Sequence, residues 1–186
     1  SGAGKEGIEE LENQVKQYTA GEEMTANLLP TGSAPKHYPV AFNLLPQIDV
    51  FLDNDYTKEE MKMVHETQKI LHDDTIQVVP TTVRVPVYRS HSESVLVETE
   101  EPVSVEAFKA ACEKFPGLQV KDNPAEQIYP MPLYTSNQND CEIGRIRKDL
   151  YNDNGMNFWI VGDQIRKGAA LNALQIAEYL VEKQAF

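Results

Sequence analysis

Two side chains in one largely apolar segment have the chemical types needed to bind an anion and to transfer protons. Residues 83–94 read VRVPVYRSHSES, with Arg84 among apolar neighbours and His91 between two serines. A buried arginine is costly unless it meets an anion, and a histidine can give and take protons near neutral pH. The composition of this segment alone favours the plainer interpretation, an exposed arginine on an edge strand and a histidine in a turn. A ligand site is the second interpretation.

Glu59 and Lys62 form a second pair of this kind, within the sequence YTKEEMKM. Residues three apart lie on the same face of a helix, and such a pair is ordinarily a solvated ion pair that contributes a few tenths of a kcal/mol. The spacing alone therefore favours a surface role over a binding role.

The elements that would position these residues can be read from periodicity and from start and stop signals. Thr57 with Glu60 three residues later forms a capping box that predicts a helix beginning there, and Ser104 opens another helix that Pro116-Gly117 ends. The sequence YNDNG at 151–155 is typical of a hairpin turn. Further helices are expected at residues 1–19 and 163–183, and strands at 76–87, 94–98, 118–120, 142–150 and 156–161.

Strands and helices that do not alternate as regular βαβ units predict an α+β fold with a largely antiparallel, mixed sheet and flanking helices. Between the first two helices, residues 20–48 are rich in Pro, Gly and Asn, and prolines at 30, 35, 39 and 46 exclude a long regular element there. So long a loop is usually functional or packed against a neighbour.

Composition excludes several classes of function. The formal net charge is −12, with 17 basic against 29 acidic residues, so a nucleic-acid partner is not expected. No apolar run approaches the ~20 residues of a membrane span. Cys112 and Cys141 form no CxxC pair, and without a secretion signal they indicate a reducing, cytoplasmic environment. The four histidines form no metal-ligand motif, so no metal site is expected.

Six motifs in register resemble the C-terminal portion of bacterial aspartate-semialdehyde dehydrogenases, over essentially all 186 residues. In chain order they are SGAG, HYPVAFNLLPQID, YTKEEMKM, VRVPVYRSHSES, GRIRKDL and RKGAALNALQIAE. The resemblance implies a domain like the C-terminal domain of glyceraldehyde-3-phosphate dehydrogenase-like enzymes. It also implies an NADP-dependent, homodimeric oxidoreductase that converts L-4-aspartyl phosphate to aspartate semialdehyde. That reaction lies on the route to diaminopimelate, lysine, methionine and threonine.

Specific roles follow from the resemblance. His91 falls on the family's acid/base histidine, and Arg84 on the arginine that binds the substrate α-carboxylate. Glu59 matches the acid that binds the substrate ammonium, and Lys62 a lysine at the phosphate site.

The resemblance also assigns residues to the cofactor and divides the chain. Ser1 and Gly2 match a turn that touches NADP, and Gln164 stands where relatives commonly have Asn or Gln near the nicotinamide. Residues 1–164 would form the substrate-binding and dimerisation domain, and residues 165–186 a helix that packs on an NADP-binding domain outside this sequence.

Two family features are missing from these 186 residues, the Rossmann domain and the segment that carries the nucleophilic cysteine. Neither Cys112 nor Cys141 matches that segment, so this polypeptide alone is expected to be inactive. Two alternatives stay open. The first is a related acyl-phosphate reductase, such as an N-acetyl-glutamyl-phosphate reductase, in which an ammonium-binding Glu59 would be idle. The second is a non-catalytic interaction module derived from the same domain.

Overall fold

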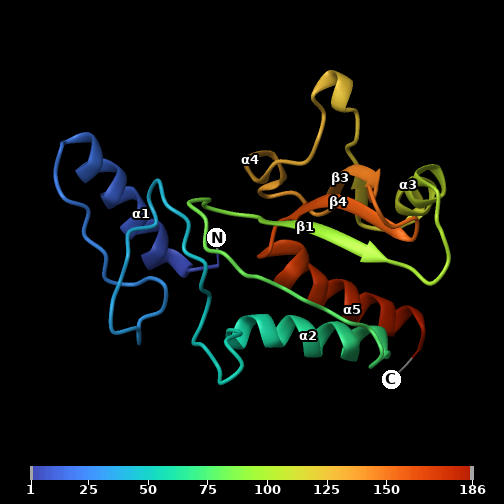
Figure 1. Cartoon of the computed structure of the whole chain (residues 1–186), viewed down its shortest axis with the longest axis horizontal. Helices are drawn as coiled ribbons and strands as arrows, with labels where there is room; N and C mark the ends of the chain where they lie inside the picture. The colour runs from blue at the N-terminus through green and yellow to red at the C-terminus, as the bar shows by residue number, and fades with distance from the viewer. Residues whose placement is uncertain (1, 185–186) are drawn as a thin grey trace. The chain divides into compact units, whose positions relative to one another are not determined.

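The computed structural model describes residues 2–184, which form five α-helices, four strands and two short helical turns (Figure 1). The helices are α1 (Gly4–Thr19), α2 (Lys58–Leu71), α3 (Val105–Lys114), α4 (Pro132–Thr135) and α5 (Leu171–Glu182). The strands are β1 (His91–Glu98), β2 (Leu118–Val120), β3 (Cys141–Lys148) and β4 (Gly155–Gly162), and the turns are η1 (Pro124–Glu126) and η2 (Arg166–Ala170). The chain divides into two compact units, an N-terminal unit that ends at Tyr88 and a C-terminal unit that begins at Arg89.

The N-terminal unit is organised by one buried glutamine on α1. The Gln14 side chain is fully buried; it donates to the Thr25 carbonyl at 2.9 Å and accepts from the N–H groups of Val40 and Ala41 at 3.0 Å. These bonds hold the irregular stretch 20–48 against the helix, where Leu11 and Leu45 belong to the same small apolar core. The long proline-rich loop is therefore packed on α1 rather than loose.

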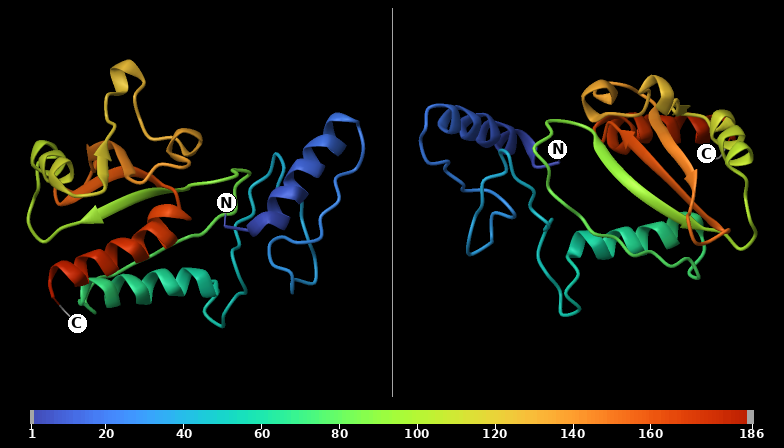
Figure 2. Two further views of the ribbon diagram at one scale, coloured as in Figure 1. Left: turned by 180° about the vertical axis from the view of Figure 1, so that it is seen from behind. Right: turned by 45° about the horizontal axis from the view of Figure 1, so that its top comes forward.

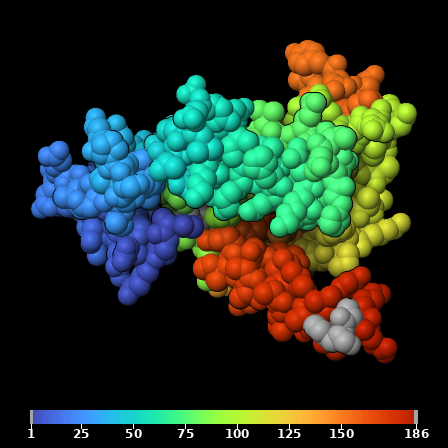
Figure 3. Space-filling view, turned by 90° about the horizontal axis from the view of Figure 1, so that it is seen from below, coloured from blue at the N-terminus to red at the C-terminus, as the bar shows by residue number. Residues whose placement is uncertain are grey.

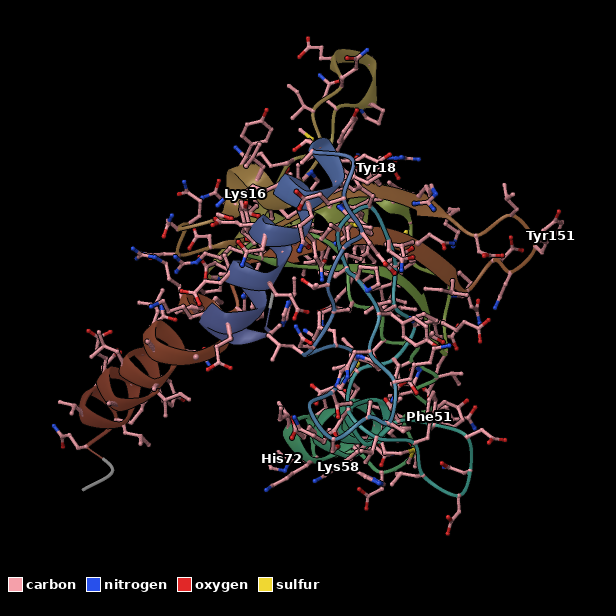
Figure 4. All side chains as sticks on the ribbon, turned by 90° about the vertical axis from the view of Figure 1, so that its left-hand side faces the viewer. Lys16, Tyr18, Phe51, Lys58, His72 and Tyr151 are labelled. Atoms are coloured by element: carbon pink, nitrogen blue, oxygen red, sulfur yellow. The ribbon has the colours of Figure 1, made fainter. Side chains whose placement is uncertain are left out.

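Helix α2 begins as the capping box predicts. The Thr57 hydroxyl accepts from the Glu60 N–H, and the Glu60 carboxylate accepts from the Thr57 N–H at 2.8 Å. The other oxygen of Glu60 accepts from the N–H of Thr82 at 2.8 Å. One buried carboxylate thus fixes both the start of α2 and the segment that leads to Arg84. Figure 4 labels Lys58 and His72, which mark the two ends of this helix.

The C-terminal unit is built on a four-stranded mixed sheet with the strand order β1-β4-β3-β2 (Figures 1 and 2). The β1–β4 and β4–β3 pairs are antiparallel, and the short β2 runs parallel to β3. Helix α3 packs on one face of the sheet, where Cys112 lies against Ile143, Ile146 and Met156. This arrangement confirms the predicted α+β class.

The hairpin predicted around YNDNG is the β3–β4 connection. The side chain of Asp149 accepts from the N–H groups of Tyr151 and Asn152, and the Gly155 N–H donates to the Asn152 carbonyl at 2.9 Å. Tyr151 extends from the tip of the turn, where it is 96% exposed (Figure 4).

The strand predicted at residues 76–87 is wrong. Among the described residues, the one β-bridge of this segment is at Arg84, which exchanges two backbone hydrogen bonds with Leu45. Pro80 and Pro86 cannot donate to a ladder, and no strand forms in this segment.

Helix α5 continues from η2 at the end of the chain and contributes no buried residue to the C-terminal unit. Its apolar side chains, among them Leu174, Ile176, Tyr179 and Val181, are each more than half exposed. Figure 3 shows this helix, in red, standing out at the molecular surface. An apolar helix face left in solvent is typical of a surface that meets another protein segment.

Candidate functional site

Three of the predicted site residues come together in the N-terminal unit, at the start of α2. The Nζ of Lys62 lies 3.0 Å from Oε2 of Glu59, and the two side chains are 49% and 36% exposed. The hydrogen bond and the charge of Glu59 raise the pKa of Lys62. Burial lowers the pKa of Arg84, while the negative charge of Glu59 acts to raise it. Glu59 therefore interacts electrostatically with both cations.

The backbone explains why Arg84 is held near that helix. Arg84 exchanges two hydrogen bonds with Leu45, at 2.8 and 3.0 Å, and the preceding Thr82 is tied to Glu60. Arg84 is half-buried. Partial burial of a guanidinium costs free energy unless an anion lies beside it, so this position favours a negatively charged ligand. Two cations and one carboxylate at one position can bind a small zwitterion that carries an additional negative charge.

His91 lies in the C-terminal unit as the first residue of β1, exposed and paired with Gly162 of β4. The predicted strand began only at Ser94, so the ladder extends further than expected and places His91 on the sheet itself. A strand position fixes the histidine more firmly than a turn would.

Ser90, the residue before His91, is anchored by a buried polar network. Ser90 has a left-handed backbone (φ 75°) and is 2% exposed, and its N–H donates to Oε1 of Gln164 at 2.7 Å. The fully buried Thr135 donates to the Ser90 hydroxyl at 3.2 Å. The predicted cofactor residue Gln164 thus contacts the backbone beside the predicted catalytic histidine.

Asp163 anchors Arg89, the residue before Ser90, and the sequence did not identify it as a site residue. Its carboxylate is fully buried, lies 2.8 Å from Nε of Arg89, and accepts from the N–H groups of Asn137, Ile165 and Arg166. Burial raises the pKa of Asp163, but these hydrogen bonds and the charge of Arg89 outweigh it and hold the pKa below its usual value. The one available signal was its position directly before Gln164.

The two cysteines differ in position but share one property. Cys112 is buried on α3, and Cys141 begins β3 with its thiol beside Gly162. Burial is the main cause that raises the pKa of both thiols. At neutral pH they are protonated, and a protonated thiol is a poor nucleophile.

The predicted cofactor residues at the N-terminus are described only in part. Ser1 lies outside the described residues. Gly2 is exposed, with φ 77°, and precedes the N-terminus of α1, whose N-cap residue Ala3 makes no side-chain cap. The first-turn N–H groups of α1 therefore have no capping side chain to compete with an anion.

Within residues 2–184, no group of three or more His, Cys, Asp or Glu side chains could hold a metal ion. None of the described helices is long and apolar enough to cross a membrane.

Comparisons with known proteins give consistent matches. Residues 1–167 match the family model described as semialdehyde dehydrogenase, dimerisation domain. The aspartate-semialdehyde dehydrogenase of Bacillus subtilis is 46% identical over 181 residues, and that of Aquifex aeolicus is 48% identical over 183. These alignments cover 97% and 98% of this chain but 52% of each relative, so the chain spans about half the length of the curated relatives.

A solved structure gives the same match in three dimensions. Aspartate semialdehyde dehydrogenase II of Vibrio cholerae, solved in complex with ASA, has a TM-score of 0.87 and 43% sequence identity. The alignment covers 98% of this chain and 52% of that one.

Proposed function

This chain belongs to the semialdehyde dehydrogenase family, and from that premise we propose that it is the substrate-binding and dimerisation part of an NADP-dependent aspartate-semialdehyde dehydrogenase. The reaction would be the reductive dephosphorylation of L-4-aspartyl phosphate, which serves diaminopimelate, lysine, methionine and threonine synthesis in the cytoplasm. The observation that carries the proposal is the grouping of Glu59, Lys62 and Arg84, because their charges complement the ammonium, phosphate and carboxylate of that substrate.

Each of these residues would recognise one group of the substrate. Arg84 would bind the α-carboxylate, since a planar guanidinium can donate two parallel hydrogen bonds. Glu59 would accept from the ammonium, and Lys62 would exchange its ion pair with Glu59 for the phosphate. The exposed Glu59–Lys62 pair suits such an exchange, because a surface ion pair costs little to open.

His91 would act as the general acid and base. A positioned imidazole can take the proton of an attacking thiol and return it when the product aldehyde is released. The Ser90 N–H bond to Gln164 and the Arg89–Asp163 ion pair fix the backbone that carries it. We further propose that the nucleophilic cysteine belongs to another part of the full-length protein, because burial raises the pKa of both Cys112 and Cys141.

NADPH supplies the hydride when it is bound. The residues of this chain that fit it are Gly2, next to the uncapped N-terminus of α1, and Gln164, a carboxamide that can pair with the amide of nicotinamide. Ser1 is assigned with them by the family resemblance alone. A homodimer is proposed because the matched family domain is a dimerisation domain. We also propose that residues 165–186 pack on the cofactor domain, which the exposed apolar face of α5 supports.

The test is kinetic and uses the full-length gene product that contains this chain. His91→Gln is expected to lower kcat by roughly 10²- to 10⁴-fold with little change in KM, whereas Arg84→Lys is expected mainly to raise KM. His65→Gln, an exposed histidine on α2, is the matched control and should behave as wild type. Near-normal turnover in His91→Gln would overturn the assignment of this residue.

A second arm tests the substrate. Aspartyl phosphate and N-acetyl-glutamyl phosphate are compared with the wild-type protein and with Glu59→Gln. If Glu59 binds an ammonium, the substitution lowers kcat/KM for aspartyl phosphate. A preference of the wild-type protein for the N-acetylated substrate would instead identify the related reductase, and no turnover of either would favour an interaction module.

A further inference from the structure

An open cavity at the surface of the C-terminal unit collects positive charge and shares no side chain with the proposed substrate and cofactor residues. It has a volume of about 610 Å³ and is lined by Lys109 of α3, by Asp122 and Tyr129, and by Arg145 and Arg147 of β3. The whole chain carries a net charge of −12, yet here three cations face one carboxylate. A local excess of positive charge in an acidic protein is a favourable place for an anion to bind.

Both oxygens of the one carboxylate in this cavity, Asp122, already have hydrogen-bond or ion-pair partners. Asp122 is only 2% exposed; Lys109 Nζ lies 2.6 Å from its Oδ2, and its Oδ1 accepts from the Arg145 N–H at 2.8 Å. Asp122 therefore neutralises Lys109 and fixes the backbone of Arg145. Within residues 2–184, no carboxylate forms an ion pair with the guanidinium of Arg145 or Arg147.

The two arginines sit on an irregular part of β3 that is held in one geometry. The register with β4 shifts between Gly144 and Arg147, and Arg145 has a left-handed backbone (φ 55°), which is unfavourable for a residue with a side chain. Arg147 Nη1 donates to the Arg145 carbonyl at 2.7 Å. Bulges commonly redirect side chains toward binding sites, and an unfavourable backbone that its neighbours maintain is often functional.

The space beneath the bulge has no room for a larger residue. A Cβ at Gly144 would lie 2.1 Å from the Lys121 carbonyl, so a glycine is needed for β3 to approach the segment that carries Asp122. The same close approach brings the α3 lysine and both strand arginines to one cavity.

We propose that this cavity binds a phosphate group, either as free inorganic phosphate or as part of a small phosphorylated metabolite. A phosphate group carries a charge near −2 at neutral pH, which matches the two arginine charges without a carboxylate partner. Guanidinium groups bind phosphate through paired hydrogen bonds, and both arginines are exposed, so a ligand can reach them from solvent. Tyr129 adds a hydroxyl and an aromatic edge for the remainder of a phosphorylated ligand. The site is distinct from the proposed phosphate-binding Lys62 and does not depend on the dehydrogenase assignment.

Binding is measured by calorimetry and by ¹⁵N NMR on this chain, with inorganic phosphate and glycerol 3-phosphate as separate probes and sodium chloride as the ionic-strength control. Arg145→Gln and Arg147→Gln should each weaken binding about tenfold, as expected for the loss of one charge-assisted contact. Lys114→Gln is the control, because Lys114 is exposed on α3 outside the cavity and the substitution removes the same charge. Arg147→Lys retains the charge but loses the paired hydrogen bonds of a guanidinium, so it should weaken binding less than Arg147→Gln does.

The two probes distinguish the source of the phosphate group. Equal affinity for both identifies free phosphate as the ligand, whereas tighter binding of the ester, reduced by Tyr129→Phe, identifies a phosphorylated metabolite. The proposal is overturned if neither probe shows saturable binding at ~10 mM, ten times a millimolar Kd, or if Lys114→Gln weakens binding as much as the arginine variants. Unchanged circular dichroism of each variant shows that its fold is intact.

Discussion

Replacement of Asp163 by Asn tests how strongly the turn before His91 is held. In the wild-type chain, Oδ1 accepts from the N–H groups of Ile165 and Arg166 at 2.9 and 3.0 Å, and Oδ2 accepts from Asn137 at 2.7 Å. Asparagine has nearly the same shape, so its oxygen can keep the first two bonds. Its NH₂ group, however, then faces two donors, the Asn137 N–H and the Arg89 guanidinium. Two contacts to a charged acceptor are lost, and the loss of one partner of a buried ion pair is costly. Because Arg89 is itself 29% exposed, water compensates it in part, and we expect a loss of ~3 kcal/mol.

The assay is urea unfolding followed by the fluorescence of Trp159, the only tryptophan, which lies on β4 in the same unit as Asp163. The control is Asp153→Asn, an exposed aspartate in the β3–β4 turn, which should stay within about 0.5 kcal/mol of wild type. A loss below ~1 kcal/mol for Asp163→Asn, which is the range of an ordinary surface contact, would refute the reasoning.

The same variant has a defined pH dependence. The pKa of Asp163 is lower in the folded state than the ordinary value of about 4, so the folded protein keeps this carboxylate ionised more readily than the unfolded chain does. The ionised carboxylate therefore contributes to the free energy of unfolding. This contribution is fully present when the pH is above the ordinary pKa, and it is lost as the pH falls through the folded-state pKa. The difference in stability between wild type and Asp163→Asn should therefore be constant from pH 7 to about 5 and should narrow below about 4.

Two further substitutions test other parts of the fold. Glu60→Gln removes the charge that accepts from Thr57 and Thr82, so it should cost the N-terminal unit ~1–2 kcal/mol and speed hydrogen exchange at both amides; Glu66→Gln, exposed on α2, should not. Gly144→Ala places a Cβ against the Lys121 carbonyl. It should destabilise the fold by the ~1–3 kcal/mol typical of an overpacked site and so lower the Tm. Gly168→Ala, whose nearest contact would be 3.7 Å away, should leave the Tm unchanged or raise it slightly.

Features that depend on neighbouring residues were predictable from the sequence. The capping box of Thr57 and Glu60 and the hairpin turn at 151–155 both form as expected, because their hydrogen bonds join residues at most a few positions apart. The predicted hairpin strands differ from β3 and β4 by only one or two residues at each end.

Features that depend on distant partners were not predictable in the same way. Residues 76–87 have the composition of a strand, but a strand also needs a ladder, and the described part of the chain forms a single β-bridge here, at Arg84. The contact of Gln164 with Ser90 joins positions 74 residues apart, and no local pattern indicates it. Likewise, Glu59 and Lys62 looked like a surface pair and do form one, so their proposed binding role rests on family resemblance and on the proximity of Arg84.

The position of β1 in the sheet has a consequence for how the chain folds. β4 pairs with β3 across a short turn, but it also pairs with β1 over eight residue positions, although residues 99–154 separate the two strands. Ordering that intervening segment costs conformational entropy before the β1–β4 ladder can repay it, and such non-local pairings slow folding. The β3–β4 hairpin joins neighbouring segments and can form quickly, whereas β1 must pair with a strand that is distant in the sequence. We therefore expect the strand that carries His91 to join the sheet after the β3–β4 hairpin has formed, although the motif RSHS around this residue is only four residues long.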